Sequence, residues 1–313
     1  MTRVPVRLCL FFTRGMSLRV WHEEGRLERE LRLYDILASR VDSLSFLTYG
    51  AQEELTFQER LGPIAILVNR WRLDSNGYSV LAPLLHHRAL RRATIFKTNQ
   101  LNGAWCAAIA KRLFGKRLVV RCGFVWSDFY ARETPSAWKR RLARAVERWT
   151  LRSADQIVVA SEADRRYFID QDDIAASKIR VIPNYVDIEH FKPDPAITTE
   201  RGLLCYVGKL GHNKNLPALL EAIREMPGVR LRLIGDGPLR KPLERQAHGA
   251  HLPVEFVGTV PNDRLPRVLN RAEAFIFPSE YEGHPKALLE AMACGLPVVG
   301  SDAPGIRDVI THG

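Results

Sequence analysis

Several features that define common protein classes are absent from this sequence. Its 313 residues include only five cysteines, and these are too widely spaced for a C-x-x-C pair, a disulfide framework or a zinc site: Cys9, Cys106, Cys122, Cys205 and Cys294. The apolar run at residues 8–12 is too short for a signal peptide or a membrane span. We therefore expect reduced, buried thiols in a cytoplasmic protein, either soluble or peripheral on the inner face of a membrane.

The balance of charge favours an anionic partner. The formal net charge is +11, while 46% of the residues are hydrophobic, enough for two ordinary cores. A nucleic acid, an acidic lipid and a phosphorylated substrate all fit this charge. Because no helix-turn-helix, zinc pattern or aromatic RNA-binding motif accompanies it, nucleic-acid binding stays only an alternative.

Strand-like and helix-like segments alternate along the whole chain, which predicts an α/β fold with parallel sheets. We expect an N-terminal Rossmann-like domain over 1–185, a proline-containing linker over 186–200, and a C-terminal domain over 201–313. The expected strands lie at 6–12, 43–48, 64–68, 94–97, 117–121, 157–160, 179–182, 203–207, 229–234, 254–257 and 274–277.

The most informative stretch runs from 276 to 300 and reads as strand, loop, helix and strand. Pro285 stands where the first helical residue is expected, and Leu288, Leu289 and Met292 are expected to form its apolar face. The loop Glu282-Gly283-His284-Pro285 lets backbone N–H groups at the helix start face an anion. Seven residues separate Glu282 from Glu290, and each carboxylate can accept hydrogen bonds from sugar hydroxyls.

A second loop supplies positive charge. Gly208-Lys209-Leu210-Gly211-His212-Asn213-Lys214-Asn215 follows a predicted strand, so two lysines can converge on one dianion. The alternative is that these loop lysines are solvated and only make the protein more soluble. Together with the glutamate pair, however, they match the needs of a nucleotide-diphospho-sugar: cations for the diphosphate and acids for the hydroxyls.

These motifs resemble the donor half of family 4 glycosyltransferases, which are retaining enzymes of the GT-B fold. The resemblance rests on the Lys209/Lys214 and Glu282/Glu290 pairs, on Ile234-Gly235-Asp236-Gly237-Pro238, and on Gly295-x-Pro297-Val298. It is strong over roughly residues 180–310. It implies two Rossmann-like domains that face each other across a cleft, and an enzyme that moves a sugar from a UDP- or GDP-sugar to a lipid-linked or saccharide acceptor.

The same resemblance implies roles for individual residues. Lys209 and Lys214 would neutralise the donor diphosphate, Glu290 would hold the ribose, and Glu282 would meet the transferred sugar; Lys209, Lys214 and Glu282 are therefore the candidate catalytic residues. The remaining expected donor contacts are Gly15, Gly208, Gly235, Gly237, Val260, Gly283, His284, Pro285, Lys286 and Ala287. No metal and no cofactor are expected.

Three departures from the family pattern bear on activity. The usual histidine of the first domain is missing, and Arg121 stands in the matching region. The chain ends at Gly313, so the second domain is expected to be truncated. Asp170-Gln171-Asp172 matches a metal-binding D-x-D but trails a helix, and we interpret it as coincidence. A catalytically silent GT-B scaffold is therefore kept as an alternative.

Residues 136–152 predict a strongly basic amphipathic helix. Its apolar side chains fall on one face: Trp138, Leu142, Ala145, Val146 and Trp149. Such a helix can lie on an anionic membrane surface. The alternative is that the apolar face packs inward on the domain while the arginines are solvated.

Overall fold

A computed structural model describes residues 5–123 and 136–311. The chain divides into two compact units, Met1–Ile182 and Pro183–Gly313, and each is considered by itself. The stretch predicted as a linker, 186–200, is grouped with the second unit. The reason is visible in Phe191, which is buried in the core of that unit.

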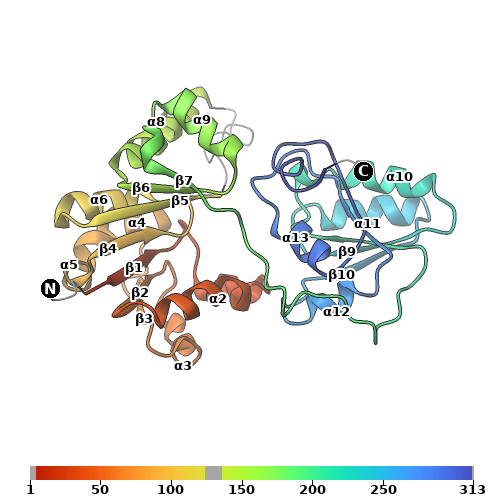
Figure 1. Ribbon diagram of the computed structural model, residues 1–313, viewed down its shortest axis with the longest axis horizontal. Helices are drawn as coiled ribbons and strands as arrows, with labels where there is room; N and C mark the ends of the chain where they lie inside the picture. Colours follow the sequence, from red (N-terminus) through yellow and green to blue (C-terminus); the bar gives the residue numbers. More distant parts are fainter. Residues whose placement is uncertain (1–4, 124–135, 312–313) are drawn as a thin grey trace. The chain divides into compact units, whose positions relative to one another are not determined.

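In the described residues the first unit contains a seven-stranded parallel sheet in the order β3-β2-β1-β4-β5-β6-β7 (Figure 1). Its strands are β1 (Arg7–Phe11), β2 (Ser43–Leu47), β3 (Ala65–Leu67), β4 (Ile95–Thr98), β5 (Arg117–Cys122), β6 (Gln156–Val159) and β7 (Ile179–Val181). The strand order reverses beside β1, as in doubly wound sheets, whose ligands approach the carboxyl ends of the strands.

Helices cover both faces of this sheet. They are α1 (Leu18–Glu23), α2 (Leu27–Ala38), α3 (Gln58–Leu61), α4 (Ser75–Leu85), α5 (His87–Arg92), α6 (Trp105–Phe114), α8 (Ala137–Ser153) and α9 (Glu162–Asp172), with short 3-10 turns η1 (Gln52–Phe57) and η2 (Ala176–Lys178). Cys9 and Phe11 of β1 pack with α4 and α6, whereas Leu8 and Leu10 pack with α1 and α2. Because both faces are buried, the strand is apolar from Leu8 to Phe11.

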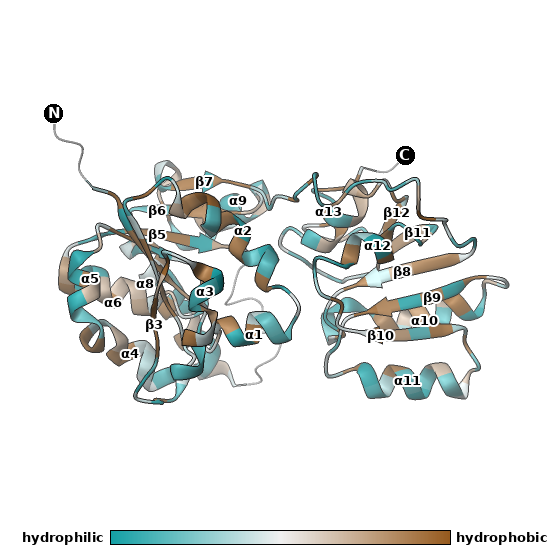
Figure 2. Cartoon of the chain, turned by 90° about the horizontal axis from the view of Figure 1, so that it is seen from below, coloured by the Kyte–Doolittle hydropathy of each residue, from teal (hydrophilic) through white to brown (hydrophobic). Residues whose placement is uncertain are grey.

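The second unit is a smaller version of the same architecture. Its five described strands form a parallel sheet in the order β10-β9-β8-β11-β12: β8 (Leu203–Val207), β9 (Arg230–Ile234), β10 (Val254–Gly258), β11 (Ala274–Phe277) and β12 (Val298–Gly300). The helical elements are η3 (His212–Lys214), α10 (Leu216–Arg224), α11 (Arg240–Gly249), α12 (Leu265–Leu269) and α13 (Lys286–Ala293). Figure 2 shows the strands mostly brown and α11 largely teal, as expected for a core sheet and a surface helix.

The predicted α/β class and parallel sheets are confirmed, and most strand ends lie within a residue or two of their predicted positions. Two predictions about α13 were wrong. Pro285 is the residue before the helix, with ψ 112°, and not its first residue. The buried face consists of Leu288, Glu290 and Ala291, while Met292 is 40% exposed. The helix is thus rotated so that a carboxylate lies inside.

The prediction for α8 is also corrected. Its buried residues are Ala143, Glu147, Thr150 and Leu151, and not the tryptophans of the apolar stripe. The second aspartate of the D-x-D motif contributes to the orientation of α8. Asp172 at the end of α9 is buried and lies 3.2 Å from Nε of Arg148 on α8, which makes the pair a structural contact between the two helices.

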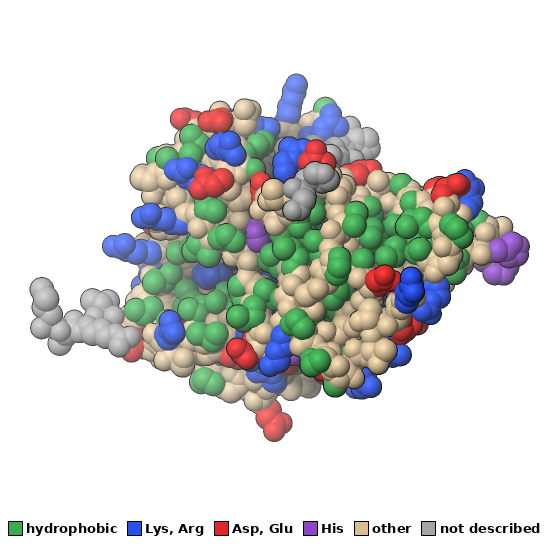
Figure 3. Space-filling model, turned by 45° about the vertical axis from the view of Figure 1, so that its right-hand side comes forward, with side chains coloured by type: hydrophobic (Ala, Val, Ile, Leu, Met, Phe, Trp, Pro, Cys, Tyr) green, Lys and Arg blue, Asp and Glu red, His purple; other side chains and the backbone are tan. Residues whose placement is uncertain are grey.

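Charged side chains can be followed on one face of the molecule. On the face drawn in Figure 3, lysine and arginine side chains are scattered among hydrophobic and acidic ones, and the coloured residues form no continuous basic surface there. All five cysteines are buried and carry free thiols, as expected. Across residues 5–123 and 136–311, no helix combines the length and the apolar character that crossing a membrane requires.

One lysine of the first sheet is held in an unusual setting. Lys97 of β4 donates hydrogen bonds to the Tyr34 hydroxyl at 3.2 Å and to the Thr98 carbonyl at 3.3 Å. Burial, and then repulsion by Arg121, lower the pKa of Lys97 to about 7, while attraction to Glu30 acts in the opposite direction. This side chain therefore loses its proton near neutrality in the folded protein.

The sign of the resulting pH dependence follows directly. Above pH 7 the unfolded chain still binds this proton and the folded chain does not, so stability rises with pH up to the ordinary lysine range, by at most about 1.4 kcal/mol per pH unit. We expect Lys97→Met to abolish this slope and to stabilise the first unit most at pH 6.5. Urea unfolding followed by tryptophan fluorescence measures it, because all six tryptophans precede residue 183. Equal slopes for both proteins between pH 7 and 9 would contradict the assignment.

Candidate functional site

Loops that are far apart in the sequence meet at one edge of the second sheet. The strands β8, β9 and β11 are parallel neighbours, so the loops after them leave the sheet at the same end. Gly208 donates its N–H to the Ile234 carbonyl at 2.9 Å, and Gly235 donates to the Gly258 carbonyl at 2.8 Å. These two contacts join the starts of the loops after β8, β9 and β10, and the N–H of Glu280 in the loop after β11 reaches the Asn213 carbonyl in the loop after β8.

The centre of this surface is an ion pair between Lys214 and Glu282. The Lys214 ammonium donates a hydrogen bond to a carboxylate oxygen of Glu282, and the two side chains are only 15% and 13% exposed. The ammonium also lies 5.7 Å from the ring centroid of Phe277. Because a lysine carries three N–H donors, Lys214 can hold Glu282 and still donate to an incoming anion.

The helix α13 begins beside this pair. Pro285 takes an extended conformation, and the helix that follows begins at Lys286, with the N–H groups of its first turn pointing toward its N-terminal end. Glu290, one turn further on, is 3% exposed. Burial first, and then the negative charge of Glu290, raise the pKa of the Cys294 thiol to about 11. The segment thus combines amide donors with an enclosed carboxylate.

Three contacts fix the loop that precedes α13. Glu280 donates its N–H to the Asn213 carbonyl at 2.9 Å, which ties this loop to the lysine loop. Glu282 donates its N–H to the Pro304 carbonyl at 3.1 Å. The Asn184 amide donates to the His284 carbonyl at 2.5 Å. The Glu282 backbone is therefore held from three directions and needs little reorganisation to bind a ligand.

The other predicted residues of this unit lie around the same edge. Lys209 is exposed, and Val260 packs against the core. A Cβ on Gly235 would overlap the Gly208 carbonyl, so only glycine allows these loops to approach so closely. The Gly237 amide, and then the Arg240 guanidinium, hold the pKa of Asp236 below its ordinary value. This acidic turn borders the lysine loop.

Two predicted residues belong to the first unit. Gly15 lies in the turn after β1 with a φ of +77°. Arg121, at the carboxyl end of β5, donates its backbone N–H to the Thr98 hydroxyl at 3.0 Å. That the Gly15 turn closes over the donor phosphates stays a prediction.

Sequence reasoning missed the residues that support these loops. The Tyr206 hydroxyl donates to the Lys209 carbonyl at 3.2 Å, and its ring stacks on Phe277. Burial, and then the charge of Glu282, raise the pKa of Tyr206 well above its ordinary value, which keeps the hydroxyl a donor. A single aromatic residue in a short apolar strand, two residues before Gly208, was the available signal.

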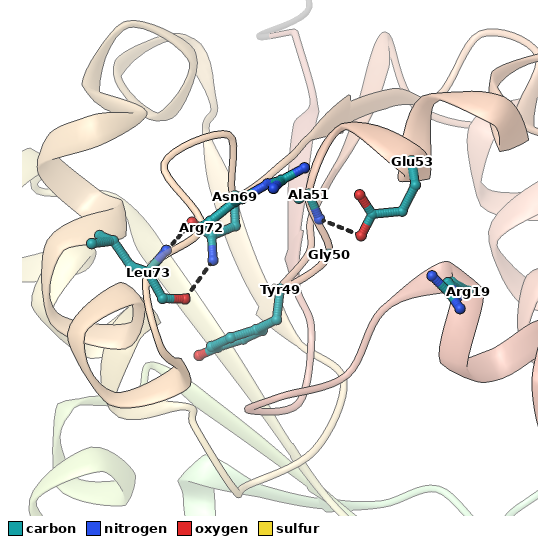
Figure 4. A pocket seen from close by; sticks show the side chains of 8 residues that line it. All are labelled: Arg19, Tyr49, Gly50, Ala51, Glu53, Asn69, Arg72 and Leu73. Carbon is teal, nitrogen blue, oxygen red and sulfur yellow. Dashed lines mark hydrogen bonds between the residues drawn. The ribbon is translucent and has the colours of Figure 1, made fainter.

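The first unit has a polar pocket at the carboxyl ends of β2 and β3, with a volume of about 500 Å³. Figure 4 shows Tyr49 between two groups of side chains, with Asn69, Arg72 and Leu73 on one side and Glu53 and Arg19 on the other. Backbone N–H groups chiefly, and then Arg19 and Arg72, lower the pKa of Glu53. Charged donors and acceptors around an aromatic ring suit a ligand rich in hydroxyl groups.

Two family models cover the chain. The model described as Glycosyltransferase Family 4 matches residues 31–190, and the model described as Glycosyl transferases group 1 matches residues 187–313. Among curated proteins, the chain is 33% identical over 184 residues to the sulfoquinovosyl transferase SQD2 of Arabidopsis thaliana, a match that covers 56% of this chain and 36% of that protein. It is 30% identical to the glycogen synthase of Mycobacterium tuberculosis, covering 55% and 44% respectively.

Solved structures show the same fold. A crystal structure of Anabaena HepE in complex with UDP and glucose superposes with a TM-score of 0.77 over 98% of this chain and 84% of that chain, at 21% identity. Sucrose-phosphate synthase of Thermosynechococcus elongatus gives a TM-score of 0.70, with 96% and 82% coverage at 18% identity. The predicted GT-B fold is thereby confirmed. The matches to the two curated relatives span 36% and 44% of their lengths.

The support of the Glu282 loop can be tested at Gly305, which has a φ of +78° and whose added Cβ would overlap the carbonyl oxygens of Glu282 and Gly283. We expect Gly305→Ala to destabilise the second unit by about 2 kcal/mol or more and to speed hydrogen exchange at residues 280–285. Urea unfolding by far-UV circular dichroism measures the first effect, and mass spectrometry the second.

The matched control is Gly249→Ala at the end of α11, where an added Cβ meets no atom within 4 Å. This change should cost nothing and can stabilise the helix by up to about 1 kcal/mol. If both substitutions had the same small effect, Gly305 would have no role in holding the loop.

Proposed function

Because this chain belongs to glycosyltransferase family 4, we propose that it transfers a sugar from a nucleotide-diphospho-sugar, with retention of configuration, to a lipid-linked or saccharide acceptor in glycan or polysaccharide synthesis. The observation that carries the proposal is the Lys214–Glu282 pair at the start of α13, with Glu290 enclosed in the same helix. One surface thus offers a cation, amide donors and two carboxylates. A UDP- or GDP-sugar needs all of them.

In the proposed chemistry the bond between the anomeric carbon and the nucleoside diphosphate breaks, and the oxygen of an acceptor hydroxyl forms a new bond to that carbon. The proton of this hydroxyl passes to the departing nucleoside diphosphate. Negative charge gathers on the leaving diphosphate as its bond to the sugar breaks. Lys214, Lys209 and the first amides of α13 stabilise that charge from fixed positions. We propose that these groups stabilise the leaving group without a metal ion and that no cofactor takes part.

The carboxylates have separate roles in this proposal. Glu290 accepts hydrogen bonds from the ribose, and Glu282, oriented by Lys214, accepts them from the transferred sugar. Gly208, Gly235, Gly237 and Val260 border the base, and Gly283, His284 and Pro285 shape the phosphate end. We assign the polar pocket beside Tyr49 to hydroxyl groups of the acceptor. The solved complex of Anabaena HepE with UDP and glucose supports a nucleotide-sugar donor.

The donor contacts are tested by nucleotide binding. We expect UDP or GDP to raise the melting temperature of the chain, because a ligand bound only by the folded state stabilises it. Lys214→Ala should raise the dissociation constant of the diphosphate about tenfold or more, since it removes a charge-assisted hydrogen bond. Glu290→Ala should weaken binding of the nucleoside diphosphate and of the bare nucleoside alike.

Lys241→Ala and Glu225→Ala serve as controls, because both residues are exposed on the surface of the same unit. Donor hydrolysis and transfer, measured with and without acceptors, separate an enzyme from a silent scaffold. Nucleotide affinities that are unchanged in both site variants would rule out the proposed donor site.

We further propose that α8 contacts an anionic membrane. Lys139 and Arg141 near the start of α8 are exposed and Arg140 between them is partly exposed, so these three are the candidates for lipid contact. Arg144 and Arg148 lie 3.8 and 3.2 Å from Asp172 of α9 and contribute to the packing of the two helices. Replacing these three by glutamine should reduce co-sedimentation with phosphatidylglycerol vesicles several-fold, with the reduction largest at low salt.

The control for this membrane test replaces Arg88, Arg91 and Arg92 of α5, which changes the net charge equally at another basic helix. Equal losses of vesicle binding in the two triple variants would refute a specific role for α8.

A further inference from the structure

The apolar stripe of α8 lies open at the surface of the first unit. Trp138 is 65% exposed, Leu142 is 55% exposed and Trp149 is 39% exposed. Contiguous exposed apolar side chains, unlike single ones, mark sites of interaction, because their burial contributes binding free energy. The helix itself is anchored by other residues, so the stripe is free to serve a ligand.

These side chains form one wall of a groove of about 530 Å³. The opposite wall comes from Trp105 and Ile109 of α6, and the groove is lined by Arg14, Asn76, Trp105, Ile109, Trp138, Lys139, Leu142, Ala143, Val146 and Trp149. Its size lies in the range of small-molecule sites. Three indole rings and several aliphatic groups make the interior suited to a hydrocarbon chain.

The polar residues of the groove carry positive charge. Arg14 follows β1, so its backbone stands at the carboxyl edge of the sheet, where ligands approach. Its N–H is bound to the Asn102 carbonyl at 3.0 Å, and its Nε is buried without a hydrogen-bond partner in the described part of the chain. Lys139 adds a second cation, and none of the lining residues within 5–123 and 136–311 is a carboxylate. The groove therefore favours an anion beside its apolar surface.

We propose that the groove between α6 and α8 binds a lipid phosphate, with the phosphate at Arg14 and Lys139 and the hydrocarbon chain along the tryptophans. This inference rests on the proposed function, since it selects the lipid-linked class of acceptor. The sugar-accepting end then lies at the same edge of the sheet as the polar pocket beside Tyr49. Each methylene buried in the groove should strengthen binding by about fourfold.

The full chain is tested with monomeric decyl phosphate, compared with decanol and inorganic phosphate, by the fluorescence of tryptophan. We expect a saturable blue shift with decyl phosphate, a weaker response to decanol, and none to inorganic phosphate. Leu142→Gln should weaken the binding of decyl phosphate at least fivefold. Leu113→Gln, which changes an exposed leucine on α6 outside the groove, should leave that affinity unchanged. Arg14→Gln should weaken the binding of decyl phosphate but not that of decanol, and Arg112→Gln should change the affinity for neither ligand.

The proposal is overturned if decyl phosphate gives no saturable signal, or if Leu142→Gln and Leu113→Gln behave alike. It is also overturned if Leu142→Gln lowers vesicle binding while monomeric decyl phosphate does not bind, since α8 would then contact a bilayer without holding a lipid chain. The nucleotide titration is separate. A chain that binds decyl phosphate but no nucleoside diphosphate would refute the donor site and leave the groove intact.

Discussion

The ion pair between Lys214 and Glu282 is the interaction on which the rest of the site depends. It joins the loop after β8 to the loop after β11, although 68 positions separate the two residues. Both side chains are mostly buried, so neither charge is tolerable there without the other. The pair therefore fixes the lysine near the start of α13, and the same contact orients the carboxylate that is proposed to meet the sugar.

The surrounding residues are arranged to keep that pair in place. The Tyr206 hydroxyl donates to the Lys209 carbonyl in the lysine loop, the Pro304 carbonyl accepts the N–H of Glu282, and the Asn184 amide donates to the His284 carbonyl. A site held this rigidly suits a reaction whose main demand is the stabilisation of a departing charge. The first unit has a polar pocket beside Tyr49 and an apolar groove beside α8, which we have proposed to bind the two ends of a lipid-linked acceptor.

Much of the fold could be predicted from the sequence, because buried parallel strands are short apolar runs bounded by glycine and proline. The strands over 203–207 and 274–277 were predicted residue for residue. The pairing of the two loops followed from parallel topology. The buried face of a single helix could not be predicted in the same way, because hydrophobic periodicity identifies that face only when the apolar residues are the ones that are buried. In α13 the buried Glu290 displaced Met292 outward, and in α8 Ala143 and Leu151 pack inward while the tryptophans face out. Both failures fall at residues proposed to meet a ligand, where local rules are overridden.

The most direct measurement is a calorimetric titration of the wild-type chain with a nucleoside diphosphate and with the matching nucleoside. If Lys214, Lys209 and the start of α13 bind the diphosphate, the diphosphate should bind about 100-fold more tightly than the nucleoside, and the difference should shrink as salt is added. Equal affinities for the two ligands, or a difference that salt leaves unchanged, would contradict the account.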